Sequence, residues 1–149
     1  MRARAVDCDK LTAQRRGLFA FPGKNMIDHI SPTRLDQLRR LIADGREALF
    51  YWWPEWADPD PERGMRAAVL RMDRGECQLC KARGRYSRGT IVHHVKHLRQ
   101  RPDLALSIWD PDTGARQLVT VCKACHELEH PESLRRSVPA APLTAERWD

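Results

Sequence analysis

The chain has 149 residues, a length that suits one ordinary domain with its own core and excludes two large ones. Its 26 Lys and Arg exceed its 20 Asp and Glu, and the formal net charge of +6 favours an anionic partner such as nucleic acid. The sequence holds no apolar run of about 18 residues and opens on MRARAVDCDK, which lacks the apolar segment of a signal peptide, so we expect no membrane contact and a cytoplasmic location.

The N-terminal part of the chain divides into an arm and a helical extension. Residues 1–30 are polar and basic with little periodicity, which predicts a loosely ordered basic arm. Residues 31–50 are expected to be helical, because Pro32 directly after Ser31 is a start signal. The positions that keep one face of this helix apolar are Leu35, Leu38, Ile42 and Leu49.

The stretch YWWPEWADPDPERG, residues 51–64, combines three Trp with three Pro. We expect an irregular connection whose aromatic side chains pack into the core, although such rings can also stack on bases. A second helix is predicted over residues 60–75, with Asp60 as its cap and Pro61 in its first turn. Its apolar positions at helical spacing are Met65, Ala68, Val69 and Met72.

Four of the five cysteines stand in two CxxC pairs, Cys77 with Cys80 and Cys122 with Cys125. In a reducing cytosol such pairs are metal ligands more often than disulfides. Two residues between the cysteines let both sulfurs of a tight turn reach one ion, and two such turns complete the tetrahedron that zinc prefers. We therefore predict a structural zinc site, with redox pairs or an iron–sulfur site as alternatives. Cys8 has no partner in the pattern and is interpreted as an incidental thiol.

A basic segment lies between the two cysteine pairs. From residue 81 to residue 101 it contains no Asp or Glu. Its cations are Lys81, Arg83, Arg85, Arg88, Lys96, Arg99 and Arg101. A charge run is usually a solvated face, but its place between two ligand pairs favours contact with backbone phosphates.

Two strands and a short helix are predicted to follow the first cysteine pair. TIVHHV, residues 90–95, is expected to pair with RQLVTVC, residues 116–122, across an excursion that contains the turn signal DPDTG. KACHELEH then suits a short helix, on which His126 and His130 share one face and can hold one metal ion. The adjacent pair His93 and His94 remains puzzling, because neighbouring side chains of a strand point to opposite faces.

Together these residues resemble the HNH endonucleases, also called ββα-metal or His-Me finger nucleases. The resemblance covers about residues 50 to 132 and is carried by FYWWPEW, VLRMDRGECQLC, IVHHVKHL and RQLVTVCKACHELEH. It is greatest to small phage and prophage members, some of which accompany terminases in DNA packaging. The resemblance implies an α+β fold, a small ββα-metal finger with a structural four-cysteine zinc site, preceded by helical N-terminal segments.

The resemblance gives the paired histidines different roles. His93 is expected to bind a catalytic metal together with His126 and His130, while His94 activates water as general base, with a bend in the chain that lets both rings face the cleft. Nine residues before the first helix histidine, where the family has a bracing Asn, this chain has Gln117. Gln keeps the amide group but adds a methylene, so Gln117 is expected to brace the same loop, or else to be an ordinary surface residue.

The implied activity is metal-dependent hydrolysis of DNA phosphodiester bonds, leaving a 5′-phosphate and a 3′-hydroxyl and nicking one strand per event. The four-cysteine site is expected to hold zinc, and the histidine site a divalent ion: zinc, nickel, manganese, cobalt or magnesium, with magnesium the least suited to imidazole. The nuclease domain is placed at residues 51–132 and a tail at residues 133–149. DNA is the expected partner, with a terminase or another packaging protein as a second one in a bacterial or phage-infected cell.

Several alternatives stay open at this point. A zinc-stapled nucleic-acid-binding module without catalysis is the rival function, and RNA is a rival substrate. Either Arg99 or Arg116 could neutralise charge near the cleft, and the sequence does not choose between them. His97 is expected to be exposed or to contact phosphate rather than to bind metal, and His29 has no constellation around it.

Overall fold

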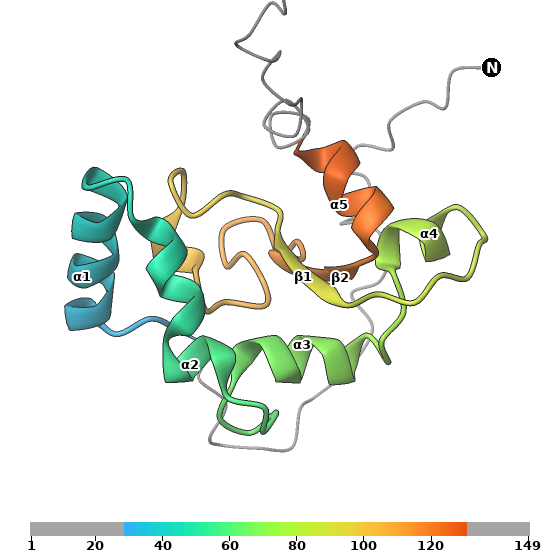
Figure 1. The fold of residues 1–149 in the computed structure, drawn as a ribbon, viewed down its shortest axis with the longest axis horizontal. Coiled ribbons are helices and arrows are strands. Elements are labelled where there is room, and N and C mark those ends of the chain that lie inside the picture. Colours follow the sequence, from blue (N-terminus) through green and yellow to red (C-terminus); the bar gives the residue numbers. More distant parts are fainter. Residues whose placement is uncertain (1–28, 131–149) are drawn as a thin grey trace, which may run out of the picture.

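A computed structural model describes residues 29–130, which form a small sheet placed between helices (Figure 1). In chain order the elements are α1 (Pro32–Ala43), the 3₁₀ helix η2 (Glu47–Trp52), α2 (Pro54–Ala57), α3 (Met65–Met72), α4 (Gln78–Ala82), β1 (Ile91–His94), the 3₁₀ helix η3 (Pro102–Leu104), β2 (Leu118–Val121) and α5 (Lys123–Glu129). No helix in this part of the chain has the length and apolar character needed to cross a membrane.

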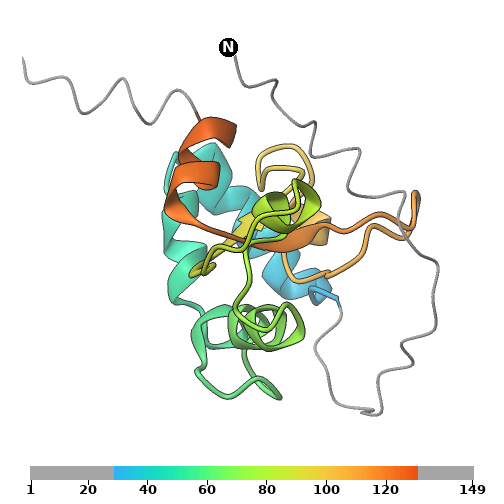
Figure 2. The same ribbon diagram turned by 90° about the vertical axis from the view of Figure 1, so that its right-hand side faces the viewer.

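The sheet consists of β1 and β2 in antiparallel register, with His93 opposite Val119 and His94 opposite Leu118. The predicted pairing of the two strands is therefore confirmed. The sheet lies between α3 and α5, and both views show α3 on one side of the strands and α5 on the other (Figures 1 and 2). The succession of β1, β2 and α5 is the ββα unit that the sequence predicts.

The Trp-rich connection forms much of the core, as expected. Trp53, Trp56 and Phe50 are buried in one cluster with residues of α1, α3 and the strands. Their rings meet at angles, with the Phe50 centroid 5.4 Å from that of Trp53 and 5.3 Å from that of Trp56. Trp52 departs from the expectation, because it is 81% exposed.

Two helix boundaries differ from the prediction. The helix predicted over residues 31–50 ends at Ala43, since Gly45 adopts a positive φ of 68° and the chain continues as η2. The second helix begins at Met65 rather than near Asp60. The Asp60 carboxylate instead accepts a hydrogen bond from the Glu62 amide, 2.9 Å away, and so closes a turn before the helix.

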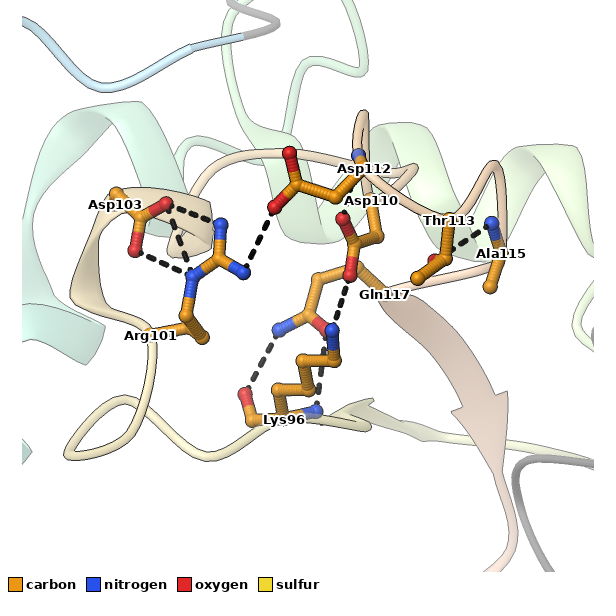
Figure 3. A network of polar contacts seen from close by, with 8 residues as sticks. All are labelled: Lys96, Arg101, Asp103, Asp110, Asp112, Thr113, Ala115 and Gln117. Atoms are coloured by element: carbon orange, nitrogen blue, oxygen red, sulfur yellow. Dashed lines mark hydrogen bonds and ion pairs between the residues drawn. The ribbon is translucent and has the colours of Figure 1, made fainter.

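The excursion between β1 and β2 is held by a polar network at its base (Figure 3). The Lys96 ammonium pairs with Asp110, whose side chain is almost fully buried. Arg101 joins Asp103 at 2.7 Å and Asp112 at 3.1 Å. The Asp110 carboxylate also accepts from the Asp112 amide at 2.9 Å, which forms the turn that the DPDTG signal predicts. These ion pairs fix the path of the chain directly after the paired histidines.

Candidate metal centres

The four cysteines of the two CxxC pairs meet at the start of two helices. Cys77 caps α4 and Cys122 caps α5, while Cys80 and Cys125 lie within the first turns of the same helices. Their sulfur atoms all lie within 4.8 Å of one another, and the Cys80 Sγ is 3.6 Å from that of Cys125. The helices supply two thiols each, which is the arrangement that a tetrahedral ion requires.

The protonation of these thiols agrees with a cation site. Burial raises the pKa of Cys80 and of Cys125. Burial also acts to raise that of Cys122, but hydrogen bonds from the Cys125 backbone and Ser87 outweigh it and lower the pKa to about 6. Four thiols this close cannot all ionise without a compensating positive charge, and a bound divalent cation supplies that charge. The donor set therefore fits a structural metal ion.

Three imidazoles meet at a second site. His93 comes from β1 and His126 from α5, and His130 is the residue that caps the C-terminal end of α5. One nitrogen of each ring lies within 4.8 Å of the others, and His130 Nε2 is 3.2 Å from His93 Nδ1. The structure thus brings together the three histidines that the sequence proposed as ligands.

Electrostatics keep these rings in the form that binds metal. Burial, together with charge repulsion from the neighbouring His130, His126 and His97, lowers the pKa of His93 to about 3. Burial and His130 also lower the pKa of His126. Neutral imidazole carries a free lone pair, so both rings are ready to coordinate an ion near neutral pH.

His94 lies beside this site on the opposite face of β1. The strand keeps a regular register as far as His94, and the bend expected at the paired histidines comes after them, at Val95 and Lys96. The His94 ring stacks on Trp56 with centroids 4.9 Å apart, and its Nε2 lies 3.0 Å from the Ala105 carbonyl oxygen. Burial lowers its pKa to about 4. The ring is only 5% exposed, yet it borders the same cavity as the three ligand candidates.

Gln117 holds the turn that follows His94. Its side chain is buried, donates from Nε2 to the Lys96 carbonyl at 2.8 Å and accepts at Oε1 from the Lys96 amide at 3.1 Å. Figure 3 shows the amide facing the Lys96 backbone. This two-point pairing is the contact that a bracing residue makes, and it excludes the alternative of an ordinary surface Gln.

The cavity at the histidine site has a volume of about 400 Å³. Glu47, Tyr51 and Arg99 form part of its wall together with the histidines. Arg99 Nε and Nη2 both bond to the Glu47 Oε1, at 2.6 and 2.5 Å, while the Glu47 Oε2 is buried without a hydrogen-bond partner in the described part of the chain. Sequence reasoning named Arg99 but missed Glu47 and Tyr51, because they reach the site from η2 through tertiary packing.

The other residues that the sequence proposed differ in whether they border this cavity. Arg116 is not among the residues that border the cavity: it pairs with buried Asp73 at 3.1 Å and donates to the Leu118 carbonyl. His97 borders the cavity, with its ring centroid 4.7 Å from that of His130, so it is nearer to the metal site than expected. His29 is exposed and outside the cavity, and Cys8 lies outside the described residues.

The order β1, β2, α5 with histidines from the first strand and the helix meeting at one point decides the fold. The chain has the ββα-metal fold of the HNH endonucleases. Among solved structures, the HNH endonuclease of the deep-sea thermophilic bacteriophage GVE2, crystallised with manganese ion, is 28% identical over 72% of this chain and 99% of that chain, with a TM-score of 0.47. No protein-family model matches the chain, and no curated protein matches it either.

Proposed function

We propose that the chain is a metal-dependent endonuclease that hydrolyses phosphodiester bonds of DNA. The observation that carries the proposal is the meeting of His93, His126 and His130 within 4.8 Å of one another, in a cavity that a further imidazole, His94, also borders. A module that only binds nucleic acid needs neither a three-ligand metal with open positions nor a base beside it. The geometry therefore favours hydrolysis over binding alone.

His94 is assigned the role of general base. The Ala105 carbonyl can only accept a hydrogen bond, so Nε2 carries the proton in that contact and Nδ1 keeps the lone pair. The pKa of about 4 leaves the ring unprotonated near pH 7, although it makes the ring a weaker base than free imidazole. In this mechanism Nδ1 takes the proton of the water that attacks phosphorus, while Trp56 and Ala105 keep the ring in place.

His93, His126 and His130 are assigned as ligands of the catalytic ion, and the four cysteines as ligands of a structural zinc. When bound, the catalytic ion supplies Lewis-acid stabilisation of the negative charge that develops on the phosphate oxygens. Three neutral nitrogens suit zinc, nickel, cobalt or manganese better than magnesium, which prefers oxygen. One such site cuts one strand, so nicking is the basic reaction and a double-strand break needs two events.

Arg99 is assigned as the cation that contacts the phosphate. It borders the cavity and is 64% exposed, whereas Arg116 is committed to Asp73 elsewhere. Both of its bonds go to a single oxygen of Glu47, so the pair is not the two-point fork that arginine makes with its strongest partners. A phosphate offers that fork, and we infer that it replaces Glu47 when substrate binds.

The biological setting follows from the resemblance to phage nucleases and is proposed on that basis. The nuclease is assigned to residues 51–132, behind the helical extension 31–50, and its site of action to the cytoplasm of a bacterial or phage-infected cell. A partnership with a terminase predicts that the two proteins co-purify when co-expressed, and their separation in gel filtration would count against it.

Conversion of supercoiled plasmid to the nicked form tests the proposal. We expect wild-type protein to nick in at least one of Mg, Mn, Ni or Zn, and His94→Ala to lose nicking while retaining both metals. His29→Ala is the matched control, because His29 is exposed and outside the cavity. Absence of nicking in every metal, with duplex binding intact, would replace the nuclease with a zinc-stapled binding module. Faster cleavage of structured RNA than of plasmid would change the substrate.

A further inference from the structure

The loop that joins α4 to β1, residues 83–90, extends from the end of the molecule opposite to α1 (Figure 1). Its arginines are Arg83, Arg85 and Arg88, and in the described part of the chain none of them forms an ion pair, whereas Lys81 just before them is paired with Glu76. Tyr86 stands among them with 80% of its surface exposed. A single exposed ring needs no explanation by itself, but a ring among cations without acidic partners suits contact with a nucleic-acid backbone.

Both ends of the loop are attached to the cysteine site. The Cys77 amide donates to the Ser87 carbonyl and the Gly89 amide to the Gly75 carbonyl, each at 2.8 Å. Near the start of the loop, the Arg85 amide donates to the Cys80 carbonyl at 3.0 Å. Gly89 is required at its position, because a Cβ there would come within 2.4 Å of the Thr120 side chain. The loop is therefore pre-organised, which lowers the entropy cost of binding.

The loop also has a fixed relation to the histidine site. Cys80 of α4 lies 3.6 Å from Cys125 of α5, and the residue after Cys125 is His126. A cation held by the four cysteines would link the start of the loop to the helix region that carries two candidate metal ligands. Contact of the loop with a strand of nucleic acid would thus set the position of that strand over the cavity.

We propose that residues 83–88 form a contact surface for the backbone of duplex DNA, with the three arginines on phosphates and the Tyr86 ring against the sugar–phosphate chain. Charge complementarity supports this partner, because three cations without acidic partners meet one negative charge per phosphate. The inference rests on the proposed function, since it names how the same enzyme engages its substrate.

Binding of a fluorescent duplex at several salt concentrations tests the inference, using the His94→Ala protein so that the DNA stays intact. Replacing Arg83, Arg85 and Arg88 with Gln should reduce the slope of log affinity against log salt by about 2.7, because each phosphate contact contributes about 0.9. Tyr86→Ala should weaken binding and leave the slope unchanged, because tyrosine carries no charge. The matched control replaces Arg39, Arg40 and Arg46, exposed residues on or just after α1.

The outcomes distinguish a specific effect of the loop on binding from an effect of net charge, and they test the loop independently of the nuclease activity. Equal losses in the loop and control variants, or an unchanged slope in the loop variant, would overturn the inference, as would tighter binding of an RNA duplex of the same sequence. Zinc content and thermal melting check that each variant folds; if the triple variant does not, Arg85→Gln alone should lower the slope by about 0.9. Loop-dependent binding without plasmid nicking would contradict the proposed nuclease activity and still support the loop as a DNA contact surface.

Discussion

Gln117 illustrates how one buried side chain sets the backbone beside the paired histidines. Its amide satisfies both the N–H and the carbonyl of Lys96, two residues after His94. We expect Gln117→Ala to lower the free energy of unfolding by about 1–3 kcal/mol, because those backbone groups lose their partner, and to slow nicking as the turn shifts. Gln117→Asn keeps the amide but is one methylene shorter, so it should restore part of both. Chemical denaturation and plasmid nicking measure the two effects, and an Ala variant as stable as wild type would contradict this role.

Arg99 and Arg116 are predicted to act on different quantities. Arg99→Gln should slow nicking about tenfold or more with little change in stability, because a charged hydrogen bond is worth about 1.5–3 kcal/mol and Arg99 is largely exposed. Arg116→Gln should instead lower stability by about 3 kcal/mol, because it leaves the buried Asp73 carboxylate without its cation. Denaturation midpoints and nicking rates of the two variants distinguish them, and the reverse pattern would assign the phosphate contact to Arg116.

At the scale of elements, α5 contributes residues to both candidate metal sites. Cys122 and Cys125 stand at its start, and His126 and His130 follow within the next turn and at its end. A seven-residue helix is too short to be stable alone, so its position should depend on the ion that we propose its cysteines share with α4. The catalytic site is therefore expected to depend on the structural one, while the reverse dependence is weak.

This asymmetry gives a prediction for metal content. Cys125→Ser should lose the structural zinc, lower the melting temperature and also weaken metal binding at the histidines, because α5 is no longer anchored. His126→Ala should lose only the histidine-site ion and keep its zinc and most of its stability. Elemental analysis and thermal melting check both variants. If the Cys125→Ser protein kept full affinity at the histidine site, the two centres would be independent.

The sequence predicts which candidate ligands come together, because their spacing is local. A CxxC turn places two sulfurs near one ion wherever it occurs, and an i, i+4 pair such as His126 and His130 shares one helix face. The pairing of β1 with β2 then follows from alternation and from the DPDTG turn. Two questions needed the structure: whether Gln117 is a surface residue, and which of Arg99 and Arg116 borders the cavity.

The rest of the site depends on long-range packing, which leaves no local pattern. Glu47 and Tyr51 reach the cavity only because η2 packs on β1, and nothing in the spacing of the sequence shows this. Trp52 is exposed whereas its neighbour Trp53 is buried. The 3₁₀ helix that ends at Trp52 and the proline after Trp53 determine where each side chain points. Amino-acid composition cannot distinguish the two. The predicted C-terminal end of the first helix and the predicted start of the second were wrong. Gly45 and the turn at Asp60 set these boundaries, although the sequence continues in a helix-like pattern past them.

At the scale of the whole molecule, the two hydrophobic clusters meet at the sheet. The larger contains the buried rings of Phe50, Trp53 and Trp56. The smaller contains Cys77, Leu79, Cys80, Val119, Val121 and Cys125. His93 and His94 lie where the two clusters join, each less than a tenth exposed. The protein therefore buries two titratable groups at the centre of its structure, and its stability should depend on pH through them.

The sign of this dependence follows from the lowered pKa values. In the folded protein without a histidine-site ion the pKa is about 3 for His93 and about 4 for His94, against about 6.5 in the unfolded chain. The unfolded state thus takes up protons first as pH falls, so the contribution of both rings is fully present well above pH 6.5. It is lost from about pH 6.5 down to about 3 for His93 and about 4 for His94. Well inside its window each ring should remove about 1.4 kcal/mol per pH unit.

Urea denaturation at pH 7.5, 6.5 and 5.5 measures this loss, and His94→Phe provides the comparison. Phe fits the aromatic surroundings of Trp56 and Phe50 and has no proton to take up, so the variant should lose about 1 kcal/mol less than wild type between pH 6.5 and 5.5. Weakening of the thiolate zinc site in acid affects both proteins equally and cancels in the difference. Occupation of the histidine site by nickel should make the unfolding free energy of the wild type less dependent on pH, because a coordinated His93 resists protonation. Parallel curves for the wild type and His94→Phe would show that His94 is not buried in its neutral form.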